Sequence, residues 1–179
     1  MIKRVDCLFI GNNRLSTNKL IDLVKNDKDY SSTFRDLNLS YVNYNDKALS
    51  LNELLSLINN GNDIDNPFNL TIAYLGSYLN RNNIVIDYIQ LFDKEKDLLK
   101  EKLLTNEILT VAILTTYFVS FFPIIEIIEF IRKYNQRVKI IIGGPFISNI
   151  VRTKSDDERD YLFKKIIKAD YYVNSSQGE

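Results

Sequence analysis

The sequence predicts an α/β protein with a parallel β-sheet that is covered by helices on both faces. Short apolar runs rich in β-branched residues alternate with longer stretches of helical periodicity along the 179 residues. The clearest run, residues 138–142, has one lysine among branched apolar residues, which is typical of a strand buried on both faces. A chain of this length is expected to form one domain and to bury roughly two thirds of its unfolded surface.

Five runs are expected to be strands, separated by helices. The strands are residues 5–11, 84–89, 108–114, 138–142 and 170–173. The helices are residues 51–58, 93–104, 123–134 and 156–168, one that ends at Asn82-Asn83, and one to about Lys25 that Ser16 or Thr17 caps. Right-handed crossovers, with the first strand near the middle, give the strand order 2-1-3-4-5, a flavodoxin-like (Rossmann-like) arrangement.

The helix that ends at Asn82-Asn83 has a stripe of side chains at helical spacing. Gly76 in this helix would allow close approach to the sheet. The stripe consists of Leu70, Ala73, Tyr74, Ser77 and Tyr78.

A polar insertion at about residues 27–66 interrupts the single domain expected over residues 1–179. The insertion is rich in Asn, Asp and Ser, and its one clear helical piece is residues 51–58, with Ser50 as cap and Glu53 three residues on. A segment of this length either folds over a ligand or is a surface excursion. The side chains available for a ligand are Tyr30, Phe34, Arg35, Asp36, Tyr41 and Tyr44.

Composition excludes several classes of function. Lys+Arg and Asp+Glu number 23 each, so no net field attracts nucleic acid or an anionic membrane. The uncharged segment 108–125 is better explained by a strand, a loop and a buried helix than by a membrane span. The single cysteine, Cys7, is expected to be a buried thiol and indicates a cytoplasmic protein. The absence of histidine excludes histidine-based acid–base catalysis, and the lack of C-x-x-C spacing excludes an iron–sulfur cluster held by this chain alone.

The candidate site lies in the loops after the first, third, fourth and fifth strands, because ligands of open α/β sheets bind beyond the carboxyl ends of the strands. These loops offer hydroxyls, amides and bare backbone with little charge, which suits a large and mostly neutral ligand. For Gly143-Gly144, which follow the fourth strand, the alternative is a tight turn without a ligand. The candidate residues are Gly11, Asn12, Asn13, Thr115, Thr116, Tyr117, Gly143, Gly144, Pro145, Phe146, Asn174, Ser175, Ser176 and Gln177.

Common nucleotide motifs are missing from these loops. The first strand lacks the G-x-G-x-x-G turn of dinucleotide sites, and no G-x-x-x-x-G-K-[ST] phosphate loop is present. A phospho-acceptor receiver domain needs an aspartate at the end of the third strand, where Thr115-Thr116 stands instead.

The motifs that are present resemble those of a known family. Thr115-Thr116, Gly143-Gly144-Pro145-Phe146 and residues 169–179 look like the N-terminal cobalamin-binding domain of radical S-adenosylmethionine enzymes. Within that family, residues 34–39, 71–76, 143–146 and 172–179 are most similar to the phosphinothricin-pathway type of radical P-methyltransferase.

The resemblance implies a cobalamin whose tail is displaced from cobalt, since a chain without histidine cannot supply an imidazole ligand. Cobalt's lower face would then meet water, another side chain or nothing. The loops 115–117 and 143–146 would hold the nucleotide tail and 174–177 would line the same cleft. The loop 11–14, with Arg35 or Tyr41, would face the corrin.

The resemblance also implies partners. The family's radical domain begins near Gly178-Glu179, so this chain is expected to be an N-terminal piece that is not catalytic alone. The iron–sulfur cluster and S-adenosylmethionine would belong to that radical domain of the same polypeptide, and the methyl acceptor would be a small molecule or a peptide. The alternative is a flavodoxin-like docking or scaffold domain that has lost its cofactor.

Overall fold

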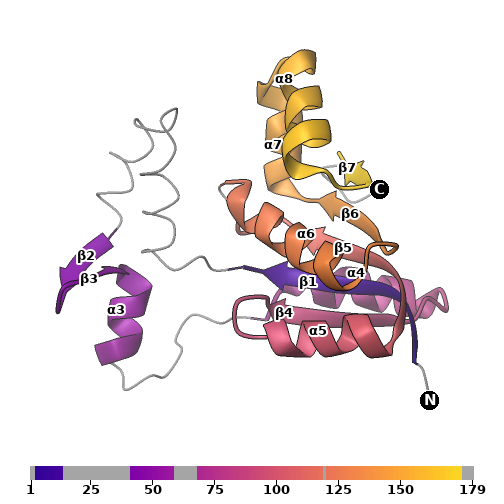
Figure 1. Ribbon diagram of the computed structural model, residues 1–179, viewed down its shortest axis with the longest axis horizontal. Coiled ribbons are helices and arrows are strands. Elements are labelled where there is room, and N and C mark those ends of the chain that lie inside the picture. The colour runs from indigo at the N-terminus through magenta and orange to yellow at the C-terminus, as the bar shows by residue number, and fades with distance from the viewer. Residues whose placement is uncertain (1–2, 14–40, 59–67, 119, 175–179) are drawn as a thin grey trace. The chain divides into compact units, whose positions relative to one another are not determined.

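The computed structural model describes residues 3–13, 41–58, 68–118 and 120–174 (Figure 1). The chain divides into two compact units, one made of Met1–Arg14 with Asn69–Glu179 and the other of Leu15–Phe68. The first unit contains the main β-sheet and its helices, and the described residues of the second form a β-hairpin followed by a helix.

The main sheet has five parallel strands in the order β4-β1-β5-β6-β7. Counted along the chain within this sheet, the order is 2-1-3-4-5, so the predicted flavodoxin-like α/β fold is confirmed. The strands also lie within about two residues of where the apolar runs predicted them. They are β1 (Arg4–Asn12), β4 (Ile86–Leu91), β5 (Glu107–Leu114), β6 (Lys139–Gly143) and β7 (Tyr171–Val173).

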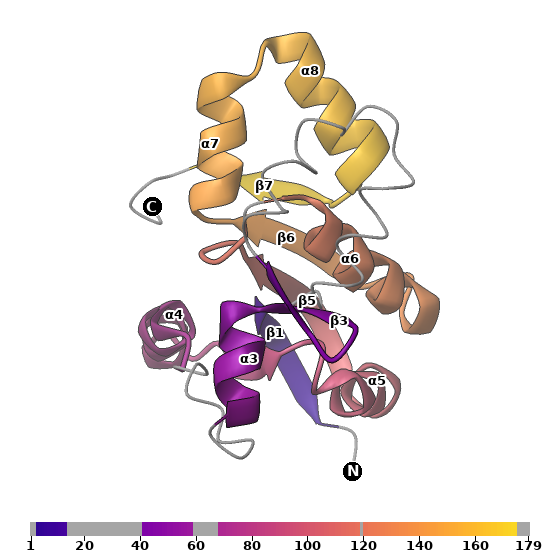
Figure 2. The same cartoon turned by 90° about the vertical axis from the view of Figure 1, so that its left-hand side faces the viewer.

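Helices lie on both faces of the sheet. Figure 2 looks onto the carboxyl edge of the strands and shows α4 (Leu70–Arg81) on one face, with α5 (Lys96–Thr105) and α6 (Phe122–Tyr134) on the other. The larger apolar core joins the strands to α5 and α6. A smaller cluster under α4 contains Cys7 and Phe9. Cys7 is the buried thiol that was expected, and its burial raises the pKa of the thiol.

The side of α4 that packs on the sheet is formed by Ile72, Leu75, Gly76 and Leu79. Gly76 does allow close approach, because a Cβ there would lie 3.2 Å from Ile86 Cδ1. The stripe from Leu70 to Tyr78 that marks the helix in the sequence therefore lies on its opposite, exposed side. Periodicity predicted the position of the helix correctly. The helix has apolar side chains on two sides, however, and only the side with Ile72, Leu75 and Leu79 packs on the sheet.

The connection from β6 to β7 contains α7 (Pro145–Thr153), α8 (Asp156–Tyr161) and a π-helix, η2 (Leu162–Ile167). The single helix expected over residues 156–168 is therefore two differently wound segments. Ser155 begins α8 with a capping box, accepting from Glu158 N while the Glu158 side chain accepts from Ser155 N. Lys168, with φ 60°, ends η2.

The second unit contains β2 (Tyr41–Tyr44), β3 (Lys47–Ser50) and α3 (Leu51–Ile58). The predicted helix at 51–58 is confirmed, whereas the antiparallel hairpin before it was not predicted. Its two-residue turn places Asn45 at φ 49° and Asp46 at φ 60°, a left-handed pair that Asn and Asp tolerate better than most residues. The helix expected to end near Lys25 lies outside the described residues.

No helix within the described residues has the length and apolar character to cross a membrane. The uncharged segment 108–125 forms β5, a loop and the start of α6, as the sequence predicted.

Candidate functional site

The carboxyl ends of β1 and β5 form the switch point of the sheet. The chain leaves β1 toward β4 on one side, and leaves β5 toward β6 on the other side. Connections that depart in opposite directions leave a crevice between adjacent strand ends, where flavodoxin-like folds bind ligands. Two of the four candidate loops, 11–13 and 115–117, lie at the carboxyl ends of these two adjacent strands and are therefore neighbours.

The amino end of α4 lies at this switch point. Asn69 is 2% exposed and caps the helix by accepting from Thr71 N, and its amide donates to the carbonyl oxygen of Gly11 at 3.2 Å. The hydroxyl oxygens of Thr71 and Thr116 are 3.4 Å apart. Sequence reasoning did not select Asn69 or Thr71 as site residues, although an asparagine directly before an apolar helix is a recognisable cap.

Asn13 has a buried side-chain oxygen that has no hydrogen-bond partner among the described residues. The side chain is 4% exposed, and its nitrogen donates to Pro123 O at 3.1 Å and to Glu126 Oε2 at 3.0 Å. Two acceptors fix the amide orientation, and Oδ1 is left buried without a hydrogen bond to any residue that the structure describes. Such an atom costs roughly 1–3 kcal/mol. Glu126 is held in turn by Lys96 Nζ at 2.9 Å, so a neutral amide sits on an ion pair.

Thr115 closes the space between the ends of β5 and β6. It is fully buried, and its backbone nitrogen and its hydroxyl both donate to the carbonyl oxygen of Gly143, at 3.0 and 2.9 Å. Gly144 has φ 115°, and a Cβ there would lie 2.9 Å from Thr115 Oγ1. The Thr115 side chain therefore joins two strand ends and has no exposed surface to offer a ligand.

The other two candidate glycines are also packed against the protein itself. A Cβ on Gly143 would lie 3.1 Å from Val173 Cβ. A Cβ on Gly11 would lie 2.9 Å from the carbonyl oxygen of Gln90. These two glycines, which the sequence offered as ligand contacts, instead lie close to neighbouring segments of the domain.

The remaining candidates differ in accessibility. Thr116, Tyr117, Pro145 and Asn174 are exposed, and Tyr117 shows 52% of its surface. Asn12 and Phe146 are half-buried, Asn12 O accepting from Phe92 N and Phe146 packing against the core. Ser175, Ser176 and Gln177 lie outside the described residues.

The sheet order separates the fifth-strand loop from the first. At the usual spacing, β7 lies roughly 10 Å from β5 and roughly 14 Å from β1. A ligand that contacted Asn13, Thr116 and Asn174 together would have to extend across four strand ends.

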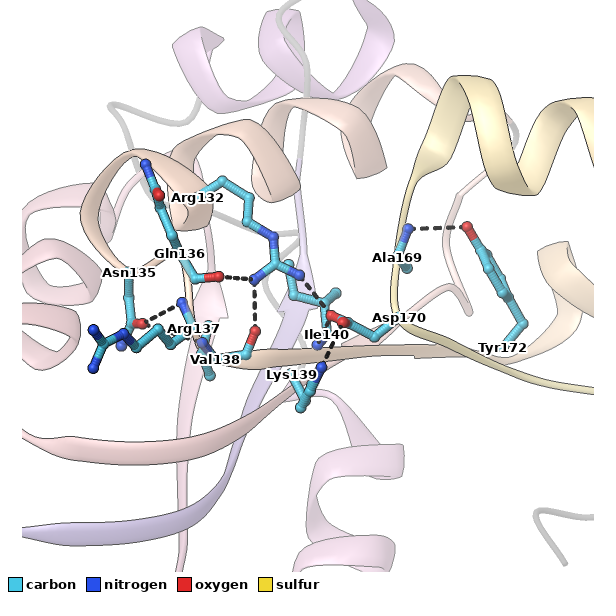
Figure 3. A network of polar contacts seen from close by, with 10 residues as sticks. All are labelled: Arg132, Asn135, Gln136, Arg137, Val138, Lys139, Ile140, Ala169, Asp170 and Tyr172. Carbon is cyan, nitrogen blue, oxygen red and sulfur yellow. Dashed lines mark hydrogen bonds and ion pairs between the residues drawn. The ribbon is translucent and has the colours of Figure 1, made fainter.

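Asp170 and Tyr172, in the segment 169–173 that is part of the family resemblance, make the contacts that Figure 3 shows, which lie away from the carboxyl edge, whereas Val173 pairs with Gly143 at that edge. Asp170 accepts from Ile140 N, Arg132 Nη2 and Lys139 Nζ at 2.8, 2.5 and 3.2 Å. Burial raises the pKa of Asp170, but these hydrogen bonds outweigh it and hold the pKa below its ordinary value. Tyr172 OH donates to Phe163 O and accepts from Ala169 N. These contacts attach β7 to β6 and to η2.

Comparison with known proteins gave no match: no family model matches the chain, and no curated protein or solved structure matches it at a significant level. The class that the fold defines is an α/β protein with a flavodoxin-like parallel sheet.

Proposed function

We propose that this chain is the cobalamin-binding domain of a cobalamin-dependent radical S-adenosylmethionine methyltransferase, and that it binds the cofactor at the carboxyl edge of the sheet. The resemblance of the loop motifs to that family, together with a strand order whose switch point accommodates ligands, supports the proposal. The domain alone is not catalytic; the radical domain of the same polypeptide would act on a small molecule or a peptide.

The orphaned oxygen of Asn13 is the observation that carries the proposal. Its position at the end of β1 places an unused acceptor at the switch point. Corrin rings carry peripheral amide groups, whose N–H donors can satisfy such an oxygen once the covering atoms shift. Exposed Thr116 and Tyr117 add a hydroxyl and an aromatic ring nearby, and none of these side chains is charged. The donor set therefore fits a large neutral cofactor.

Within the proposal, the candidate residues divide into two roles. Asn12, Asn13, Thr116, Tyr117, Pro145 and the loop 174–177 contact the cofactor. Thr115, Gly11, Gly143, Gly144 and Phe146 position those loops, because their side chains or Cα atoms pack inside the domain. When bound, the cofactor supplies a methyl group carried on cobalt for transfer to a substrate radical. This chain orients it and offers no imidazole to the metal.

Retention of hydroxocobalamin tests the proposal. The purified chain is incubated with the cofactor and desalted, and the visible spectrum of the protein fraction is recorded. Near-stoichiometric corrin is expected, and Thr116→Trp is expected to abolish retention by filling the switch point. Thr105→Trp, at an exposed threonine that ends α5, is the matched control. Complete separation of wild-type protein and corrin would refute the proposal.

The alternative, a docking or scaffold domain without cofactor, is favoured by a different observation, the exposed apolar side of α4. That surface also bears on how the domain associates, whether or not it binds cobalamin.

A further inference from the structure

Helix α4 is apolar on two opposite sides. Ile72 and Gly76 are buried against the sheet, while Leu70, Tyr74 and Tyr78 on the other side are 77%, 74% and 61% exposed. Arg81, the last residue, is the sole charged one in the helix. A helix with this pattern is normally buried between two layers, since a solvent-facing side is usually charged. In the described part of the first unit, the sheet forms one of those layers, and no second layer covers the side with Leu70, Tyr74 and Tyr78.

Within the described residues of the first unit, the same face of the sheet has no cover beyond α4. Strand register places Phe9, Ala112, Ile141 and Tyr171 side by side in one row, and Leu114, Gly143 and Val173 in the next. Partners in parallel strands point to the same face, so this is the face that α4 covers at Phe9 and Leu114. Beyond it, Tyr171 and Val173 are 56% and 37% exposed and Ile141 is half-buried. We call Ile141, Tyr171 and Val173 the open strip.

The exposed side of α4 and the open strip are both apolar surfaces without a cover in the described part of the first unit, and their widths match. Parallel sheets are almost always covered on both faces. The open strip spans two strands, roughly 10 Å, which is about the width of one helix. The exposed side of α4 needs an apolar layer, and the open strip needs an apolar helix.

We propose that two copies of this chain associate with twofold symmetry, each α4 lying on the open strip of the other copy. The two α4 helices then lie side by side between two facing sheets, and each helix buries one side on its own sheet and the opposite side on the partner's. Such an interface is isologous, so every contact occurs twice. The zero net charge of the chain leaves no overall repulsion between copies.

The area is sufficient for a reversible dimer. The exposed parts of Leu70, Tyr74, Tyr78, Tyr171 and Val173 amount to on the order of 500 Å² per copy, since a buried tyrosine accounts for 150–250 Å². A standard interface buries about 800 Å² per partner, so association is expected to depend visibly on concentration.

Sedimentation equilibrium of the whole 179-residue chain tests the dimer. Over roughly 1–500 µM, the mass is expected to rise from 20.9 kDa toward twice that value. Tyr74→Glu on α4 and Tyr171→Lys on the open strip should each weaken dimerisation at least about tenfold, because each buries an unpaired charge. Tyr161→Glu, on α8 and 60% exposed, is the matched control and should leave dimerisation unchanged.

Mixing the two variants distinguishes this arrangement from any other. In a mixed dimer, Glu at position 74 of one copy faces Lys at position 171 of the other, and the second contact is wild type. The mixture is therefore expected to recover dimerisation that neither variant shows alone. A chain that stays monomeric at the highest concentration, a Tyr171→Lys variant that still dimerises, or a mixture without recovery would overturn the inference. Corrin retention is measured separately, so failure of one proposal does not decide the other.

Discussion

Thr115 Oγ1 lies 2.9 Å from the carbonyl oxygen of Gly143, so a threonine at the end of β5 holds the end of β6. In the sequence the same threonine is a candidate ligand contact. Its complete burial gives it a structural task that is present without any ligand.

Replacing Thr115 measures that task. Thr115→Val removes the hydroxyl and keeps the shape, and we expect a loss of about 1 kcal/mol in the free energy of unfolding. Thr115→Ser keeps the donor and should lose less. Urea denaturation of the three proteins provides the values. Equal stability of the valine variant and wild type would mean that the hydroxyl bond contributes nothing net.

Alanine should be costly at Gly144 and tolerated at Gly76. Gly144→Ala forces a Cβ onto φ 115° and to 2.9 Å from Thr115 Oγ1, so we expect at least about 1–3 kcal/mol of destabilisation. Gly76→Ala gains helix propensity of up to about 1 kcal/mol, against a 3.2 Å contact with the flexible end of Ile86. Its stability should stay near that of wild type. Thermal unfolding compares them, and equal losses would contradict the backbone argument.

Asp170 should make stability depend on pH in a defined window. Its pKa in the folded state lies below the ordinary value of 3.8, so the native state binds its proton less readily than the unfolded state does. The resulting stabilisation is present above pH 3.8 and is lost as pH falls through the lower, folded-state pKa. The stability difference between wild type and Asp170→Asn is therefore expected to shrink as the solution is acidified.

Urea titrations at several pH values below 6 test this. Asp157→Asn, at an exposed aspartate of α8, is the charge-matched control. A wild-type advantage over Asp170→Asn that stays constant down to strongly acidic pH would exclude Asp170 as the titrating group.

Binding of the proposed cofactor should stabilise the domain through Asn13. Hydroxocobalamin at about 100 times its dissociation constant should add about 2.7 kcal/mol to the free energy of unfolding. Asn13→Ala removes the orphaned acceptor, so its own melting temperature should rise less with cofactor than that of wild type. Each protein is compared with itself without cofactor, which separates binding from the loss of the Pro123 and Glu126 bonds. Asn149→Ala, at an exposed asparagine in α7, should respond as wild type does.

The sequence predicted the elements of the sheet well. Continuous apolar runs such as residues 138–142 identify buried parallel strands, and their alternation with helices leads to the order that the structure has. The helix that begins at Leu51 also followed from its cap and periodicity. The hairpin before it was missed because its turn, Asn45-Asp46, lacks the glycine of the strongest hairpin signals.

By itself the sequence determined where the five strands of the main sheet form, where α3, α4, α5 and α6 form, and which loops share one edge, because those properties depend on local periodicity and chain direction. Which residues far apart in the sequence contact one another was decided by the tertiary structure alone. Arg132 meets Asp170 across 38 residues, Asn13 meets Pro123 across 110, and Thr115 meets Gly143 across 28. The same is true of α4, where two stripes of similar spacing compete. Burial against a particular sheet chooses between them, and that choice depends on long-range packing that no local pattern contains.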